Sequence, residues 1–222
     1  MNALSVILPA LNAARTLSAA LAAVGSGVEV IVADGGSHDA TPTVAAAAGA
    51  RVVAAPRGRG VQLAKGAEIA QGAWLLFLHA DTVLDGGWRA EAETFMADPA
   101  NRTRAAAFRF ALDDAAPQAR RLERVVAWRA RVLGLPYGDQ GLLIRRDFYS
   151  ALGGFRPLPL MEDVDLVRRI GRARLSILAT PAVTSAARWQ REGWLRRSVR
   201  NLTCLTLYLA GVPPRLLVRM YG

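Results

Sequence analysis

Carboxylate side chains follow two of the apolar stretches in this 222-residue sequence. Asp34 directly follows the run 28–33, and Asp81 lies just beyond the run 74–78. A carboxylate can accept hydrogen bonds from a base or ribose, and it can hold a hard cation that neutralises a diphosphate. We therefore expect a nucleotide site in which Asp34 contacts the nucleoside and Asp81 the cation.

Basic side chains are placed to assist the same site. Arg57 and Arg59 lie in the segment RGRG, a glycine-bounded turn that opens a predicted helix. The first turn of a helix exposes unpaired N–H groups, and arginine donates two parallel hydrogen bonds to phosphate. We expect both arginines to contact phosphate or base; a solvated turn is the alternative.

A third group of acids lies far downstream, in the segment MEDVD. Glu162, Asp163 and Asp165 fall in the first turn of a predicted helix. Neighbouring like charges raise the pKa of a carboxylate, which favours proton abstraction. The alternative is that these acids only complement the helix dipole.

The run at 74–78 ends abruptly in polar residues, at His79 and Asp81. Its length and apolar character predict a strand buried on both faces of a parallel sheet. Ligands in open α/β sheets bind beyond the carboxyl ends of such strands. If the chain stays extended to Thr82, His79 and Asp81 point the same way and face one ligand. An ordinary polar loop is the alternative.

Strands and helices alternate through the first half of the chain, which predicts a layered α/β sheet with mostly parallel strands. We expect strands at 4–11, 28–33, 51–54, 74–82, 105–112, 142–145 and 175–179. We expect helices at 13–24, 43–48, 62–70, 88–96, 118–132, 147–152 and 161–170, from 186 to near 211, and after Pro213–Pro214. No repeat or linker interrupts this order, so residues 1–222 are expected to form one domain.

Composition narrows the class of protein. The single cysteine, Cys204, excludes an internal disulfide and favours a reducing, cytoplasmic setting. The N-terminal residues lack the basic region of a signal peptide, and no apolar run approaches the roughly 20 residues that a membrane-spanning helix needs. We therefore expect no membrane span.

Charge is distributed unevenly along the chain. Residues 1–100 carry 6 basic and 9 acidic side chains, whereas residues 101–222 carry 22 basic and 9 acidic ones. This asymmetry favours an anionic partner for the second half, either membrane lipid, nucleic acid or a phosphorylated substrate. Because 27 of the 28 basic residues are arginine, a GC-rich genome is an alternative source of the excess.

Several familiar sites are excluded by their missing residues. The segment PALNAAR after the first strand lacks the glycines of a dinucleotide-binding loop, and no P-loop pattern occurs. His38 and His79 are the only histidines, so a site with many histidine ligands is excluded.

Six short motifs occur in order between residues 5 and 165, and the similarity they carry runs over about 4–221: SVILPALN, VADGGSHDAT, RGRG, LHADT, GDQG and MEDVD. Together they resemble family 2 glycosyltransferases of the GT-A fold, and are most similar to the bacterial subgroup linked to arsenosugar biosynthesis and radical-SAM proteins. The resemblance implies a Rossmann-like domain with C-terminal helices, a nucleotide-diphosphate sugar donor and Mg²⁺ or Mn²⁺. It assigns residues 1–100 to the donor and residues 101–222 to the acceptor and the C-terminal helices.

The resemblance also implies roles for single residues. Pro9 and Asn12 would lie in the loop that contacts the nucleotide, Asp34 would bind the base, and Arg57 and Arg59 would add contacts. The HAD triplet stands where the family has DxD, so Asp81 would carry the metal and the diphosphate, with His79 beside it. Glu162 and Asp163 stand where the acceptor's general base is found, with Asp163 as the base of an inverting transfer, and 138–141 matches the acceptor-side loop.

His79 departs from the family pattern because it replaces the first acid of DxD. A neutral imidazole brings no charge to a divalent ion, although it can ligate Mn²⁺ or bond to a phosphate oxygen. The metal would then depend on oxygens supplied by the diphosphate.

The donor expected from the resemblance is a UDP-sugar, and the acceptor an unidentified small molecule or lipid-linked group; no nucleic acid is expected. A nucleotidyltransferase of similar fold is one alternative. Another is a non-catalytic, basic membrane-surface module, because four arginines and two tryptophans flank an apolar segment as in an interfacial helix. They are Arg191, Arg196, Arg197, Arg200, Trp189 and Trp194, beside Leu202–Val212. The expected location is the cytoplasm, with peripheral contact at the inner membrane face.

Overall fold

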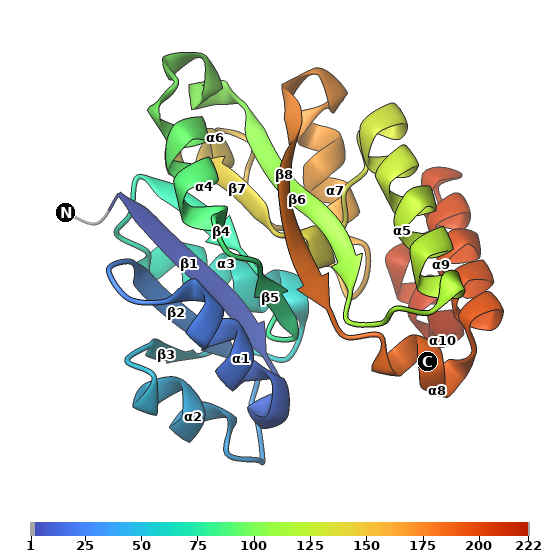
Figure 1. The fold of residues 1–222 in the computed structure, drawn as a ribbon, viewed down its shortest axis with the longest axis horizontal. Coiled ribbons are helices and arrows are strands. Elements are labelled where there is room, and N and C mark those ends of the chain that lie inside the picture. The colour runs from blue at the N-terminus through green and yellow to red at the C-terminus, as the bar shows by residue number, and fades with distance from the viewer. Residues whose placement is uncertain (1–2, 222) are drawn as a thin grey trace.

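The computed structural model describes residues 3–221, in which eight strands form one mixed sheet with helices on both faces (Figure 1). The strand order is β3-β2-β1-β4-β7-β6-β8-β5. The strands are β1 (Leu4–Ala10), β2 (Glu29–Asp34), β3 (Arg51–Ala54), β4 (Trp74–Phe77), β5 (Thr82–Leu84), β6 (Ala105–Leu112), β7 (Leu142–Arg145) and β8 (Leu175–Thr184). The predicted mixed, mostly parallel α/β sheet is confirmed.

Four strands from the first half of the chain form the main parallel block of the sheet. Strands β3, β2, β1 and β4 are parallel neighbours, and β6 runs parallel to β8. Strand β7 pairs antiparallel with both β4 and β6, and so joins the two halves of the chain in one sheet. Strand β5 pairs antiparallel with β8.

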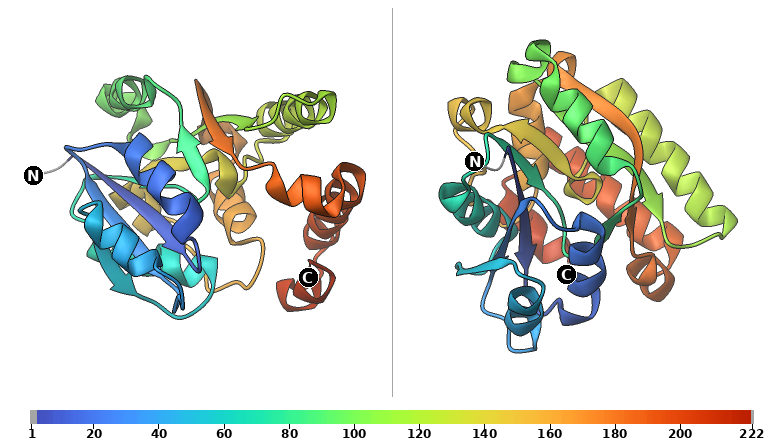
Figure 2. Two further views of the ribbon diagram at one scale, coloured as in Figure 1. Left: turned by 60° about the horizontal axis from the view of Figure 1, so that its bottom comes forward. Right: turned by 60° about the vertical axis from the view of Figure 1, so that its left-hand side comes forward.

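Helices cover both faces of the sheet, as Figure 2 shows from two further sides. They are α1 (Ala14–Val24), α2 (Thr41–Ala47), α3 (Arg59–Ile69), α4 (Trp88–Ala97), α5 (Pro117–Trp128), α6 (Arg146–Ala151), α7 (Glu162–Ile170), α8 (Ala187–Glu192), α9 (Trp194–Leu209) and α10 (Pro214–Tyr221). Helices α1, α2 and α4 pack into the core on one face, and α3, α6 and α7 into the core on the other.

The C-terminal helices form two smaller cores of their own. Helices α5 and α8 pack with β6 around Phe110 and Trp189. Helices α9 and α10 pack on α7 around Cys204, Leu205 and Leu217. Helices α8, α9 and α10 are therefore attached to the rest of the fold largely through β6 and α7.

Three predicted elements differ in extent. The helix predicted from 186 to 211 is broken at Gly193, whose φ of 87° interrupts it between α8 and α9. Strand β8 continues past its predicted end at Ala179 to Thr184, because it passes Pro181 through an irregularity in its pairing with β6. The strand predicted at 74–82 is two strands, β4 and β5, separated by a turn.

Within residues 3–221, none of the helices combines the length and the apolar character needed to cross a bilayer.

Candidate active site

The carboxyl ends of the parallel strands create the site. Ala10 at the end of β1 lies beside Asp34 at the end of β2, and β4 ends at Phe77 on the other side of β1. Loops bearing Asn12, Asp34 and His79 therefore leave the sheet at one edge, as the strand-end argument predicted.

A buried glutamine ties two of these strand ends together. Gln62, on α3, donates from Nε2 to the carbonyl oxygens of Ala10 at 2.7 Å and Ala33 at 2.8 Å. Gly35 passes so close that a Cβ there would meet the Gln62 amide at 2.9 Å. This contact fixes the positions at which the loops after β1 and β2 begin.

Asp34 and Asn12 organise the first of these loops. Asp34 Oδ2 accepts hydrogen bonds from the backbone N–H groups of Gly36 at 3.1 Å and Ser37 at 3.0 Å. Asn12, with a positive φ of 50°, accepts from the His38 N–H at 2.9 Å, and its own N–H donates to the Ser37 hydroxyl. Asp34 thus acts as a turn residue here, and its Oδ1 also accepts from the Ser37 hydroxyl.

Pro9 lies inside β1 rather than in the loop where it was predicted. It pairs with Ala33 of β2, but β4 stops opposite Ile7, two residues earlier. Beyond Ile7 the β4 side of β1 is a free edge, where the missing N–H of proline costs no strand pairing. Asn12 does lie in the loop.

Arg59 joins the first half of the chain to the acidic segment of the second. Its Nε lies 3.2 Å from Oε1 of Glu162, and its Nη1 lies 3.4 Å from Nε2 of His79. Glu162 is only 2% exposed, and burial raises its pKa, an effect that Arg59 opposes and Asp163 reinforces. Arg57, two residues earlier, is exposed on the preceding loop.

His79 is held as a neutral imidazole. Burial lowers its pKa well below the usual value, and the positive charges of Arg59 and Arg188 lower it further. The backbone turns here, because the Thr82 N–H donates to the His79 carbonyl at 3.2 Å. The expectation that His79 and Asp81 share one side of an extended chain is therefore wrong.

Asp163 lies at the start of α7, facing the loop before β7. Its Oδ2 accepts from the Gly138 N–H at 2.8 Å, and its Oδ1 accepts from the Val164 N–H at 2.7 Å. A Cβ on Gly138 would lie 2.5 Å from Nε2 of His79 and 3.4 Å from Oδ2 of Asp163. Only glycine allows this loop to approach both side chains.

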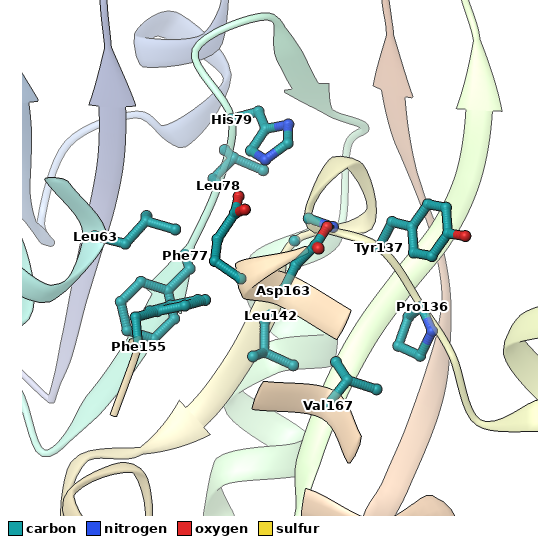
Figure 3. Close-up of a pocket in the computed structure, with 13 residues that line it drawn as sticks. Leu63, Phe77, Leu78, His79, Pro136, Tyr137, Leu142, Phe155, Asp163 and Val167 are labelled. Atoms are coloured by element: carbon teal, nitrogen blue, oxygen red, sulfur yellow. The ribbon is translucent and has the colours of Figure 1, made fainter. Parts of the chain in front are cut away.

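Figure 3 shows His79 and Asp163 above an apolar floor that includes Phe77, Leu142 and Phe155. The lining residues enclose a cavity of about 20 Å³, which is room for about one water molecule. The polar groups of the cluster are thus backed by a dry, packed core.

Asp139, to which the sequence gives no catalytic role, lies in the loop 138–141 beside Asp163. Burial raises its pKa to about 6; Arg129 lowers that pKa, and the charges of Asp163 and Asp81 raise it. Its Oδ1 is buried without a hydrogen-bond partner among the described residues, as is Nη2 of Arg129. A buried polar atom left unpaired in a cleft is the signal of a functional role, and this signal exists only in three dimensions.

Arg188 is a second residue that the sequence left without a role. It is exposed on α8, and its positive charge helps to lower the pKa of His79. Asp165, by contrast, is structural: its carboxylate binds Arg156 at 3.1 Å and Arg169 through the next turn of α7. Arg169 also donates to the carbonyl oxygens of Leu152 and Gly154, which fixes the loop before α7.

The family model described as "Glycosyl transferase family 2" matches residues 5–133, more than half of the chain, including the loops of Asn12, Asp34, Arg59 and His79. The chain belongs to this family. The finer assignment to the arsenosugar or radical-SAM subgroup stays a prediction.

Curated relatives of this family 2 chain are uncharacterised glycosyltransferases. Those of Mycobacterium tuberculosis and Mycobacterium bovis are 40% identical to it over 87 residues, which is 39% of this chain. The matched stretch spans 40% of the relatives' own length.

Solved structures share the fold at low sequence identity. Residues 1–349 of TarS from S. aureus are 15% identical with a TM-score of 0.65, covering 100% of this chain and 69% of that chain. Glucosyl-3-phosphoglycerate synthase from Mycobacterium tuberculosis, in complex with Mn²⁺, UDP and glucosyl-3-phosphoglycerate, is 20% identical with a TM-score of 0.63. That alignment covers 96% of this chain and 81% of the synthase.

The donor groups available for a cation are few. Within residues 3–221, no group of three or more His, Cys, Asp or Glu side chains is arranged to hold a metal ion. Asp81 and the neutral His79 supply at most two ligands. The single carboxylate of Asp81 fits an ion such as Mg²⁺ or Mn²⁺ that takes further oxygen ligands from substrate phosphates, and an imidazole ligand suits Mn²⁺ rather than Mg²⁺.

Proposed function

We propose that this chain transfers a sugar from a UDP-sugar to an unidentified small-molecule or lipid-linked acceptor, with inversion at the anomeric carbon. The observation that carries the proposal is the Asp163 carboxylate, held by the Gly138 N–H beside the neutral His79 at the carboxyl edge of the sheet. Membership of family 2, and the UDP and UDP-glucose in complexes of the synthase of similar fold, support a nucleotide-sugar donor.

In the proposed reaction, Asp163 accepts the proton of the acceptor hydroxyl as the hydroxyl oxygen bonds to the anomeric carbon. The bond between that carbon and the diphosphate oxygen breaks, and UDP leaves with the electron pair. Arg59 offsets negative charge on the leaving group, and His79, neutral because it is buried between two arginines, donates or accepts a hydrogen bond without repelling a cation.

Asp81, with His79, would hold the divalent cation, which when bound neutralises charge on the leaving diphosphate. The Asp34 loop would hold the base. Arg57 and Asn12 would contact the nucleotide from the flanking loops, and Pro9 would shape the end of β1.

Replacing the proposed base tests the chemistry. Donors are first selected by thermal shift against a set of nucleotide sugars with Mn²⁺, and UDP release is then followed. Asp163→Asn should lower turnover by about a thousandfold, because a positioned general base contributes that order of rate, while the donor Kd stays within a few-fold. Asp85→Asn, on an exposed loop, is the matched control. Turnover of Asp163→Asn close to wild type would remove Asp163 from this role, and release of pyrophosphate would indicate nucleotidyl transfer.

The metal assignment has its own test. Asp81→Ala should weaken UDP binding by about tenfold in the presence of Mn²⁺ and little in its absence, because Asp81 acts through the cation. Calorimetric titration of both proteins, with Mn²⁺ and with a chelator, measures the difference. Equal affinities in all four titrations would exclude Asp81 as a metal ligand.

A further inference from the structure

Exposed apolar side chains are concentrated in one part of the molecule. Among the described residues, every large hydrophobic side chain that is strongly exposed lies on α5 and the π turn after it, on α9, or on α10. They are Val125, Trp128, Val132, Leu133, Leu195, Val199, Leu202, Leu209, Leu216, Val218 and Met220. We call these residues the C-terminal apolar surface.

The exposed residues of α9 form a stripe along one side of the helix. Leu195, Val199, Leu202 and Leu209 are spaced by four, three and seven residues, which places them on one face. Leu195 is 78% exposed and Leu202 is 63% exposed. Helix α9 already buries Cys204 on the opposite side and Leu205 at the edge of the stripe, against α7 and α10. It therefore carries a second apolar face that the described chain leaves open to solvent.

The other two segments repeat this arrangement. Val125, Trp128 and Val132 follow the same helical spacing along α5 and the π turn, and Arg124 and Arg131 are exposed beside them. On α10, Leu216 and Met220 are one turn apart, with exposed Arg215 and Arg219 next to them in sequence. Each exposed apolar stripe thus has arginines along its border.

Negative charge is scarce on these helices. From residue 187 to the end, the sequence has seven arginines and a single acid, Glu192. Glu192 already accepts hydrogen bonds from Arg197 and Arg200. The exposed arginines that remain give this region a positive surface.

These helices lie together at one end of the molecule. Figure 1 and the left view of Figure 2 place α5, α9 and α10 at the side opposite β3 and the N-terminus. The three segments therefore lie on the same side of the fold.

We propose that the C-terminal apolar surface docks on a membrane containing anionic lipid. Leucine and valine side chains would enter the boundary between headgroups and acyl chains, and the bordering arginines would bind lipid phosphates, as in an interfacial amphipathic helix. Trp128 has the side chain favoured at that boundary. The sequence suggested Trp189 and Trp194 for this contact, but their rings stack on each other with centroids 6.4 Å apart, and Trp189 is buried. Trp128 is therefore the tryptophan that would contact the membrane.

Two other occupants fit the surface less well. A nucleic acid would satisfy the arginines but leave the leucines and valines in water. A second copy of the chain would cover the leucines but bring arginine-rich surfaces together, which costs electrostatic energy. Only anionic lipid matches both the apolar stripes and their charged borders.

Vesicle sedimentation tests the proposal with the full chain. Wild type should bind vesicles of phosphatidylcholine mixed with phosphatidylglycerol, bind pure phosphatidylcholine more weakly, and lose affinity as salt is raised. The double variant Leu195→Glu, Leu202→Glu should lose binding by about tenfold or more, because two charges would enter the lipid boundary. Both positions are exposed, so the fold should be retained, which circular dichroism checks.

The matched control places the same two charges elsewhere. Ala19→Glu with Ala22→Glu alters exposed positions of α1 and should bind vesicles like wild type. Trp128→Ala gives a second reading on a different helix and should also weaken binding. Asp163→Asn should bind vesicles normally, because docking does not depend on the proposed sugar transfer.

Three results would overturn the proposal. The first is wild-type protein that ignores anionic vesicles, and the second is equal vesicle binding by wild type and the Leu195→Glu, Leu202→Glu variant. The third is a wild-type protein that is a dimer by light scattering and does not bind vesicles, together with a Leu195→Glu, Leu202→Glu variant that is a monomer. A second copy of the chain would then be what covers the surface.

Discussion

The two halves of this chain differ in how their functional residues are held. In the first half, the loop after β2 is fixed by its own hydrogen bonds, from Asp34 to Gly36 and Ser37. In the second half, Asp163 and Glu162 are positioned by contacts that reach other segments, Gly138 and Arg59. The proposed donor side is therefore held by contacts within the first half, whereas the proposed catalytic side also needs Arg59 of the first half against Glu162 of the second.

The contact between the halves is tight as well as polar. A Cβ on Gly60 would lie 2.5 Å from the carbonyl oxygen of Arg156 and 3.1 Å from Cβ of Glu162. The two halves also differ in net charge. The first half is slightly acidic, and the second half carries the excess of arginine. Apart from loss of the proposed base Asp163 itself, changes at this boundary should lower turnover more than changes within either half.

The largest boundary effect is expected from Gly138→Ala. Its Cβ would lie 2.5 Å from Nε2 of His79, so the loop or the imidazole must move and Asp163 loses its aligned N–H donor. Displacement of a catalytic group by about 1 Å can cost about a hundredfold in rate, and we expect a loss of that order in UDP release. Gly86→Ala, where a Cβ meets open space, is the control. Unchanged turnover in Gly138→Ala would show that the approach of this loop is not required.

A smaller effect is expected from Arg59→Ala. Glu162 would be left buried without its ion-pair partner, which should cost about 1–2 kcal/mol of unfolding free energy. This cost is smaller than for a fully buried pair because the Arg59 side chain is about one third exposed. Removing the positive charge also raises the Glu162 pKa further, so the folded variant holds its proton to higher pH. Its stability deficit should therefore grow as pH rises through the acidic range.

Chemical denaturation at several pH values measures this change. Arg57→Ala, at the exposed position two residues earlier, should leave stability unchanged. An equal loss of unfolding free energy in Arg59→Ala and Arg57→Ala would mean that the ion pair between Arg59 and Glu162 does not stabilise the fold.

The last effect is expected on the pH dependence of stability, from a change at Asp139 within the second half. Its pKa in the folded chain is raised to about 6, so the folded state binds a proton more tightly than the unfolded state between about pH 4 and 6. Wild-type stability should fall as pH rises through that window, by at most about 3 kcal/mol, whereas Asp139→Asn should not show this fall.

Thermal unfolding at pH 4.5 and pH 8 compares the two proteins, with exposed Asp85→Asn as the control. The Asn variant should match wild type at the lower pH and exceed it at the higher one. A variant that is less stable than wild type at both values would contradict the burial of a strained carboxylate at this position.

The sequence predicted the strand ends of the first half well because they follow from local patterns. Apolar runs located β1, β2 and β4, and parallel pairing then placed Asn12, Asp34 and His79 at one edge. The same patterns failed just beyond the strand, where a turn from His79 to Thr82 replaced the extended chain. Turns at strand ends depend on what packs against them, which periodicity does not record.

The catalytic side was harder to predict because its geometry is non-local. MEDVD pointed to Asp163 and Glu162, but nothing in the chain indicated that Gly138 would bind Asp163 or that Asp139 would be buried. The exposed stripe of α9 was visible as an apolar segment, yet which of its faces would be covered depended on packing against α7. Such features require the assembled structure.

The central claim is that a nucleotide sugar binds at the edge formed by β1, β2 and β4, next to Asp163. Titration of isotopically labelled protein with UDP and Mg²⁺, followed by amide NMR, tests it directly. The amides of Asn12, Ser37 and Gly138 should shift, while those of α9 stay in place. Shifts confined to α9, or none at the strand ends, would contradict the account.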